Sequence, residues 1–191
     1  MLESNGLFIV GIPTKDEYVV GRTMSDIFKT ALLMNKTPEF IWGVGTNICG
    51  GRDLILKLAK EKISSSSCRM LWLDSDVWIR TPPEELATYL KEADENNYNI
   101  VAPYRRSDKQ GTLSSVGNDD GVYYWDALNT LQQYSPVTWA GLGFYYGITP
   151  LDYKFYMSGD LSEDYHFFKD NKIELRLEKR IALGHYKQVF I

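Results

Sequence analysis

The stretch Met70-Leu-Trp-Leu73, followed by Asp74-Ser75-Asp76, decides the fold of this chain. Four consecutive apolar residues are typical of a central strand in a parallel sheet, which is covered on both faces. Buried strands seldom end in two acids that only contact water. Open α/β folds bind their ligands at the carboxyl ends of the parallel strands. The sequence therefore predicts an α/β fold with a polar site directly after residue 73.

Strand and helix patterns alternate on both sides of this segment, which favours parallel strands joined by right-handed crossovers. The predicted strands are residues 7–13, 40–44, 70–73, 99–103, 122–125 and 137–148. The predicted helices are residues 22–35, a second helix that opens near Arg52 after a loop at 45–51, a third that starts at the Pro82-Pro83 pair, and a fourth that ends at residues 165–170. We expect a Rossmann-like fold in which residues 1–191 form a single domain, with a central mostly parallel sheet flanked by helices.

Three details of this fold follow from local patterns. In the first helix, Met24, Ile27, Phe28, Ala31 and Leu32 have the spacing of one helical face, so we expect them to pack on the sheet. The polar, Gly-containing region 105–126 predicts an antiparallel excursion or a loop, of which residues 105–120 are a candidate lid. The alternating tail, residues 173–191, predicts edge strands.

Composition excludes several classes of protein. With 44% hydrophobic and 24% charged residues, the chain is globular rather than disordered. A net charge of -4 gives no reason to expect a nucleic-acid partner, and the densest basic cluster is only Arg105, Arg106 and Lys109. No segment has the length and apolar character of a membrane span, although peripheral membrane contact and the oligomeric state stay open.

The two cysteines, Cys49 and Cys68, exclude a disulfide framework and fit a reducing cytoplasm. A single bridge between them stays open.

Asp74 and Asp76 are the candidate metal ligands. Residues two apart in an extended segment project from the same face, so both carboxylates can converge while Ser75 points away. Such a pair at the carboxyl edge of a sheet suits a hard divalent cation, Mn²⁺ or Mg²⁺, that also coordinates a diphosphate. A lone D-x-D occurs often by chance, and its place after a buried strand is what makes this one informative.

From these residues outward, the chain resembles the GT-A glycosyltransferases, in which an apolar strand leads into a D-x-D. Residues 7–14 resemble the first strand and nucleotide-binding loop of that family, and Arg52 stands where members place an arginine before the metal strand. Glu163-Asp164 resembles the late acidic motif, and Gly184-His185 the terminal Gly-His. These landmarks span most of the chain in the family's order. The size is also similar to that of a compact viral member from a thermophilic archaeal host, a resemblance that would place the protein in the host cytoplasm.

The resemblance implies transfer of a sugar from a nucleotide-diphosphate sugar to a glycan or protein acceptor. Asp76 would bind the metal directly, Asp74 would reach the ribose or bind the metal through water, and His185 would add a nitrogen ligand that favours Mn²⁺. The nucleotide would contact residues 13–14, which are Pro13 and Thr14, and Arg52 would face its phosphates.

The late acidic pair, Glu163 and Asp164, is either catalytic or structural. In an inverting enzyme Asp164 would be the general base, with Glu163 in reserve, whereas a retaining enzyme needs no such base. Acids in a first helical turn are also ordinary capping residues, and that interpretation stays open.

Other interpretations of the same residues also stay open. Trp139, Tyr145 and Tyr146 either stack on a sugar or belong to the core. Asp74 at the end of an apolar strand also resembles the nucleophile of haloacid-dehalogenase phosphohydrolases, although that motif normally lies on the first strand. A nucleotidyltransferase normally has a Gly-rich basic opening loop, which this sequence lacks. A catalytically silent protein that binds a nucleotide sugar would keep the same fold.

Overall fold

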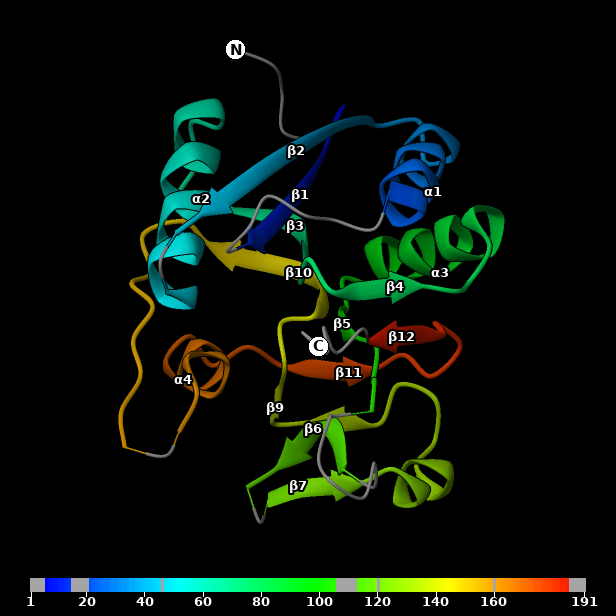
Figure 1. Ribbon diagram of the computed structural model, residues 1–191. Coiled ribbons are helices and arrows are strands. Elements are labelled where there is room, and N and C mark those ends of the chain that lie inside the picture. Colours follow the sequence, from blue (N-terminus) through cyan, green and yellow to red (C-terminus); the bar gives the residue numbers. More distant parts are fainter. Residues whose placement is uncertain are drawn as a thin grey trace, which may run out of the picture.

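A seven-stranded sheet forms the centre of the computed structural model (Figure 1). The structure describes residues 6–14, 21–45, 47–105, 113–119, 121–159 and 161–185, except for the side chains of Gly21 and His185. In spatial order the strands are β2 (Thr37–Val44), β1 (Leu7–Thr14), β3 (Ser67–Leu73), β10 (Phe144–Pro150), β5 (Asn99–Val101), β11 (Leu175–Leu177) and β8 (Pro136–Val137).

Five of the seven strands of this sheet run in the same direction. β1 pairs in parallel with β2 and β3, and β5 with β11, whereas β10 runs antiparallel to β3 and β5 and β8 runs antiparallel to β11. The carboxyl ends of β2, β1, β3, β5 and β11 therefore lie along one edge, as in other Rossmann-like α/β folds. The prediction of edge strands in the tail is wrong for β11, because β8 pairs with its outer side.

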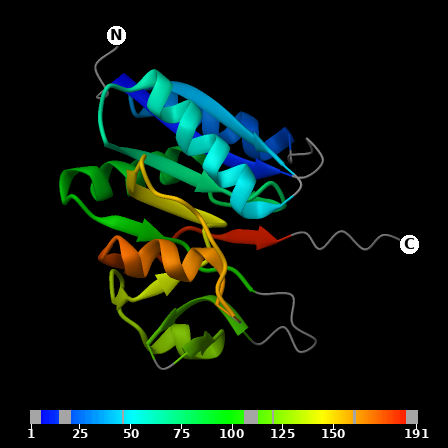
Figure 2. The ribbon, with the colours of Figure 1, turned by 90° about the vertical axis from the view of Figure 1, so that its left-hand side faces the viewer.

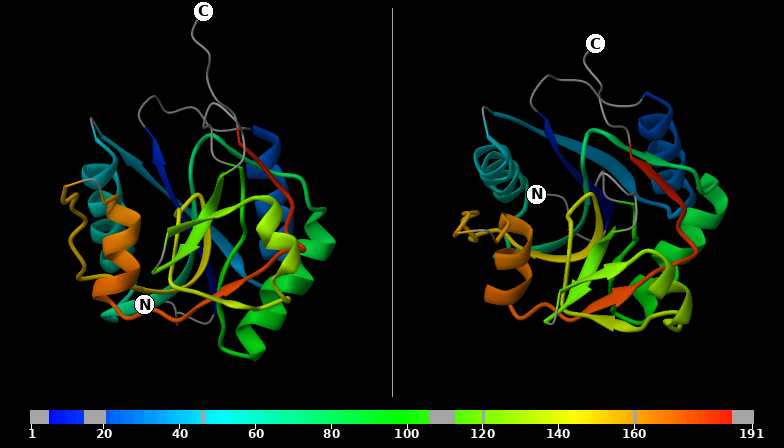
Figure 3. Two further views of the ribbon diagram at one scale, coloured as in Figure 1. Left: turned by 90° about the horizontal axis from the view of Figure 1, so that it is seen from below. Right: turned by 60° about the horizontal axis from the view of Figure 1, so that its bottom comes forward.

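Helices cover both faces of the sheet (Figure 3). α2 (Ile48–Lys62) and α4 (Glu163–Asp170) pack on one face, and α1 (Gly21–Leu33) and α3 (Pro83–Glu95) on the other. β1 shows the underlying alternation, since Ile9 belongs to one apolar cluster and Val10 to the other. β3 is covered on both sides, and residues 70–73 are fully buried, as predicted.

The start of α2 differs from the prediction. The helix begins at Ile48, and the side chain of Asn47 caps it by accepting a hydrogen bond of 2.7 Å from the backbone N–H of Gly50. Gly51 lies inside the helix. A side chain at this position would not fit, because a Cβ there would approach the carbonyl oxygen of Gly43 to 2.7 Å. The glycines predicted to form a loop thus allow close packing of α2 on β2. Arg52 is consequently the fifth residue of the helix and not its opening residue.

The apolar face predicted for α1 is partly wrong. Ile27 and Ala31 are fully buried, but Phe28 is 48% and Leu32 is 55% exposed. Thr23 and Thr30 are buried instead, and the hydroxyl of Thr30 donates to the carbonyl oxygen of Asp26 at 2.8 Å. A threonine that satisfies its hydroxyl within the helix can occupy the buried face, which hydrophobicity alone does not reveal.

Two smaller antiparallel sheets lie beside the carboxyl edge. β4 (Val77–Ile79) pairs with β12 (Leu183–His185), and β6 (Leu113–Asn118) pairs with both β7 (Gly121–Tyr124) and β9 (Trp139–Ala140). A 3₁₀ helix, η2 (Asp126–Thr130), follows β7. The antiparallel excursion predicted within residues 105–126 is thus confirmed. Residues 113–118 of the predicted lid form strand β6. Residues 106–112 and 120 of that lid lie outside the described residues.

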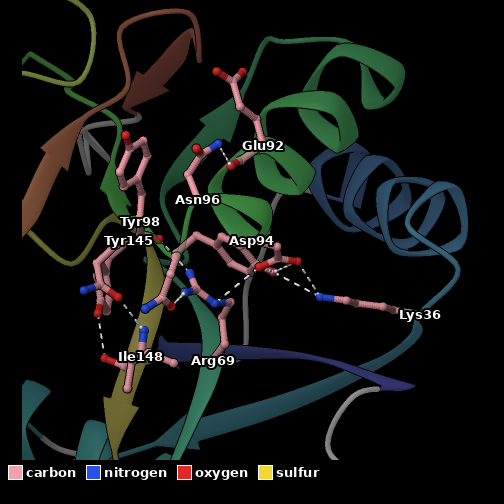
Figure 4. Close-up of polar contacts among 11 residues, drawn as sticks. Lys36, Arg69, Glu92, Asp94, Asn96, Tyr98, Tyr145 and Ile148 are labelled. Atoms are coloured by element: carbon pink, nitrogen blue, oxygen red, sulfur yellow. Dashed lines mark hydrogen bonds and ion pairs between the residues drawn. The ribbon is translucent and has the colours of Figure 1, made fainter.

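The opposite end of the sheet is held by a polar network around Asp94 on α3 (Figure 4). Its carboxylate accepts from Lys36 Nζ at 2.7 Å and from the Tyr146 hydroxyl at 2.8 Å, and it pairs with Arg69 Nε at 3.3 Å. Arg69 also donates to the carbonyl oxygen of Tyr98 at 2.7 Å. These contacts tie α3 to β3 and β10.

No helix in the described ranges is long and apolar enough to cross a membrane. Cys49 and Cys68 are both free thiols in the structure. Burial raises the pKa of the Cys68 thiol to about 12.

Candidate active site

Asp74 and Asp76 lie in a turn rather than in an extended segment. β3 ends at Leu73, and the backbone N–H of Val77 donates to the carbonyl oxygen of Asp74 at 3.0 Å, which closes a turn over residues 74–77. The alternation rule that predicted two converging carboxylates does not apply to a turn. The two acids nevertheless interact, because the charge of Asp76 contributes to raising the pKa of Asp74.

The guanidinium of Arg52 gathers three carboxylates from two elements. Its Nη2 donates to Asp74 Oδ1 at 3.2 Å, and its Nη1 donates to Glu163 Oε1 at 2.9 Å and to Asp164 Oδ1. Only 1% of the Arg52 side chain is exposed, and its guanidinium lies 5.7 Å from the centre of the Phe155 ring. α2 and α4 cover the same face of the sheet (Figure 2). The junction after β3 and the first turn of α4 are thereby joined through α2.

This arrangement corrects the expected place of Arg52. The sequence predicted a helix that opens near Arg52 and a side chain that faces the phosphates of the nucleotide. The structure instead places it in the helix, with both terminal nitrogens bonded to carboxylates. The acids at 163 and 164 do stand in a capped first turn, since the Ser162 side chain accepts from the backbone N–H of Tyr165.

The cluster carries excess negative charge. Asp74, Glu163 and Asp164 all pair with Arg52, so three carboxylates share one guanidinium. Burial first, and then the nearby charges of Asp76 and Glu163, raise the pKa of Asp74 against the opposing effect of Arg52. Asp74 keeps 23% of its side chain exposed. Carboxylate oxygens, excess negative charge and access fit a hard divalent cation.

The remaining predicted residues lie along the same edge. In the pairing of β1 with β3, Gly11 stands opposite Trp72, so Pro13 and Thr14 end β1 level with the turn that holds Asp74. His185 ends β12, where its backbone pairs with Val77, next to Asp76. Its side chain lies outside the description. Among the described side chains no group of three or more His, Cys, Asp or Glu is arranged around one point as metal ligands.

A cavity of about 460 Å³ opens beside Asp164. It lies between the β6-β7-β9 sheet and the first turn of α4, and it is bounded by twelve residues. These are Tyr104, Ser115, Asn118, Asp119, Gly121, Val122, Trp139, Gly141, Leu161, Ser162, Asp164 and Tyr165. Asp164 therefore contacts both the Arg52 cluster and this cavity, whereas Glu163 is bonded to Arg52 and does not line the cavity.

The three aromatic residues considered for sugar stacking, Trp139, Tyr145 and Tyr146, do not lie together. Tyr145 and Tyr146 are buried in the core, and Trp139 alone of the three lines the cavity. Sequence reasoning missed Tyr104 and Tyr165. A signal for Tyr104 exists in Gly141 and Gly143, because a Cβ at either position would come within 2.8 Å of its ring or hydroxyl.

Comparison with known proteins shows the fold. No family model and no curated protein matches this chain. The chain is similar to a crystal structure described as A197 from STIV, with 15% sequence identity and a TM-score of 0.62 over 95% of this chain and 86% of that chain. At this identity the likeness establishes the shared architecture, and function has to be argued from the site.

Two further likenesses are weaker. One is to a glycosyltransferase involved in the glycosylation of the major capsid of PBCV-1, with a TM-score of 0.34 and 18% identity over 64% of this chain and 63% of that chain. The other is to mannose-1-phosphate geranyltransferase from Thermus thermophilus, with a TM-score of 0.44 and 12% identity over 94% of this chain and 76% of that chain. TM-scores this low carry no argument about this chain.

Proposed function

We propose that this protein is a metal-dependent glycosyltransferase that moves a sugar from a nucleotide-diphosphate sugar to an acceptor hydroxyl. The observation that carries the proposal is the position of Asp164, which is bonded to Arg52, the partner of Asp74 after β3, and also lines an open cavity. An inverting transfer needs a base between the charged donor site and the acceptor site.

The donor site is proposed at the carboxyl edge, over Pro13, Thr14 and the turn at Asp74. Asp76, Asp74 and His185 would hold a divalent cation, Mn²⁺ or Mg²⁺. When bound, that ion supplies charge neutralisation for the departing nucleoside diphosphate. The excess carboxylate charge supports a cation here, and the pairing of β12 with β4 supports the choice of His185, since it brings residue 185 beside Val77.

Asp164 is the proposed general base. A carboxylate that lines the cavity can take the proton of an acceptor hydroxyl as that oxygen attacks the anomeric carbon, and the bond to Arg52 fixes the orientation of the carboxylate. Glu163 is assigned a positioning role, because its bond to Arg52 holds the guanidinium while its own carboxylate lies outside the cavity. Arg52 is likewise a positioning residue that sets Asp74 and Asp164 in a fixed relation.

The proposal is tested by incubating the protein with UDP-sugars and GDP-sugars and measuring the nucleoside diphosphate released, with Mn²⁺ and with EDTA. Without an acceptor, a glycosyltransferase slowly transfers the sugar to water and so still releases the nucleoside diphosphate. Release that requires metal therefore supports a glycosyltransferase. Hydrolysis of p-nitrophenyl phosphate without nucleotide release would indicate the phosphohydrolase alternative. Metal-dependent binding of a nucleotide sugar with no release, also in the presence of acceptors, would indicate a silent protein of the same fold.

A further inference from the structure

The cavity beside Asp164 combines flat aromatic surfaces with uncharged hydrogen-bonding groups. Tyr104, Trp139 and Tyr165 supply the aromatic rings, and Ser115 and Asn118 supply polar side chains. Its volume of about 460 Å³ lies in the range of small-molecule sites, roughly 300 to 1,000 Å³. Aromatic surface together with a few fixed polar groups is the composition that binds an amphipathic small molecule.

Trp139 is held as a rigid wall of this cavity. Its indole N–H donates to the carbonyl oxygen of Asn118 at 3.0 Å, and its ring lies against Gly117, where a Cβ would approach two ring atoms to 2.6 Å. The Tyr165 ring meets it edge-on, with ring centres 6.4 Å apart at 62°. Since both rings are held in place before any ligand binds, contact with a flat ligand face costs the protein little conformational entropy.

The charge of the cavity selects against anionic ligands. The charged residues that line it, in the described part of the chain, are Asp119 and Asp164, and both are acidic. The nearby Lys169 is paired with Asp119. A phosphorylated or carboxylated ligand would therefore meet carboxylates rather than a guanidinium or an ammonium group, and like charges at short range repel.

We propose that this cavity binds a neutral glycan, with a sugar face on Trp139 and Tyr165 and a hydroxyl directed to Asp164. The inference rests on the proposed function and narrows its acceptor from a glycan or protein to an uncharged carbohydrate. A pyranose has one apolar face and a rim of hydroxyls, which matches the aromatic wall and the Ser115 and Asn118 side chains. The acidic lining disfavours phosphorylated sugars and phosphorylated lipid carriers, because Arg52 and Lys169 are already paired with Asp164 and Asp119.

Saturation-transfer NMR tests the assignment on the full chain. The probes are neutral methyl disaccharides of mannose, glucose, galactose and N-acetylglucosamine, their 6-phosphates, and a short polyprenyl phosphate. At least one neutral disaccharide is expected to bind, and its phosphate at least tenfold more weakly. Val122→Trp, which fills the cavity, and Trp139→Ala are each expected to weaken that binding at least tenfold. Tyr124→Ala, a change of an aromatic residue 64% exposed on the same small sheet, is the control and leaves binding unchanged.

The outcomes separate this inference from the proposed function. Stronger binding of a phosphorylated probe, no binding of any neutral disaccharide, or unchanged binding by Val122→Trp overturns the assignment of the cavity. UDP and GDP binding with Mn²⁺ is measured on the same samples. If a neutral glycan binds but neither nucleotide does, the glycosyltransferase proposal is contradicted and the glycan site is supported. If a nucleotide binds but no neutral glycan does, the glycan site is contradicted and the glycosyltransferase proposal is supported.

Discussion

Arg52 on α2 donates a hydrogen bond to the carboxylate of Asp164 on α4, 112 residues later in the chain. The same guanidinium bonds Asp74 after β3, so one buried side chain sets the distance between the candidate metal turn and the candidate base. A planar guanidinium with several fixed donors can bond carboxylates in two directions at once, which a single ammonium group cannot do as well. The geometry of the site therefore depends on a residue that we expect to touch neither substrate.

Replacement of Arg52 tests this dependence. Arg52→Met leaves three partly buried carboxylates without their cation, and we expect a loss of about 3 to 5 kcal/mol in the free energy of unfolding. Arg52→Lys is expected to recover only part of that loss. Arg22→Met is the matched control, because the Arg22 side chain is 73% exposed and its pair with Asp26 is 3.7 Å long. Urea unfolding measures all three, and a loss for Arg52→Met no larger than for Arg22→Met would contradict the prediction.

Asp74 gives a pH-dependent prediction for the metal-free protein. Because the folded state raises the pKa of this carboxyl, its ionisation costs stability as the pH rises through that raised value, and the cost is absent below the unfolded value of about 3.9. Asp74→Asn should therefore raise the melting temperature at pH 7, with the difference vanishing near pH 4. Thermal melts in EDTA at both pH values measure this effect, and a lower melting temperature of the variant at pH 7 would refute it.

The two neighbouring acids of α4 are expected to differ in catalysis. Asp164→Asn should lower the rate of sugar transfer by roughly 10² to 10⁴ with nucleotide affinity nearly unchanged, because it removes the general base. Glu163→Gln should keep most of the rate, since its side chain still accepts from Arg52. Steady-state transfer assays with both variants decide between them. A reversed order would move the base to Glu163, and equal small effects would favour a retaining mechanism.

The polar network at the opposite end of the sheet should affect stability without affecting the site. Asp94→Ala leaves Lys36, Arg69 and the Tyr146 hydroxyl without their shared carboxylate, at an expected cost of about 2 to 4 kcal/mol. Tyr146→Phe should cost only about 1 kcal/mol. Arg69 and Asp74 are five residues apart across β3, roughly 16 Å, so calorimetry should give the same nucleotide affinity in both variants. A changed affinity would show that the two ends of the sheet are coupled.

The sequence predicts the fold well where short-range patterns determine it. Four consecutive apolar residues before Asp74 identify the central strand, and Pro83 with the acids at 84 and 85 identifies the start of α3. The start of α2 is misplaced because Gly50 and Gly51 are typical of loops, and only the structure shows that Gly51 is needed within the helix for its close contact with Gly43.

The candidate site is predicted in its residues but not in its contacts. The order of motifs places Arg52, Asp74 and Asp164 in one site, yet the bonds from Arg52 to the carboxylates of Asp74 and Asp164 depend on how α2 and the first turn of α4 are placed over the sheet. The cavity could not be predicted from the sequence. It combines residues from β6, β7, β9, α4 and the segment after β5, and no local pattern links such distant segments.

Calorimetric titration of UDP and GDP tests the central claim most directly, with and without Mn²⁺, on the intact protein and on Asp76→Ala. The account predicts that one nucleoside diphosphate binds with Mn²⁺, that EDTA abolishes this binding, and that Asp76→Ala loses it while keeping its melting temperature within a few degrees. Binding of neither nucleotide under any condition, or binding that is the same with EDTA and in Asp76→Ala, would contradict a metal-dependent nucleotide-sugar site after β3.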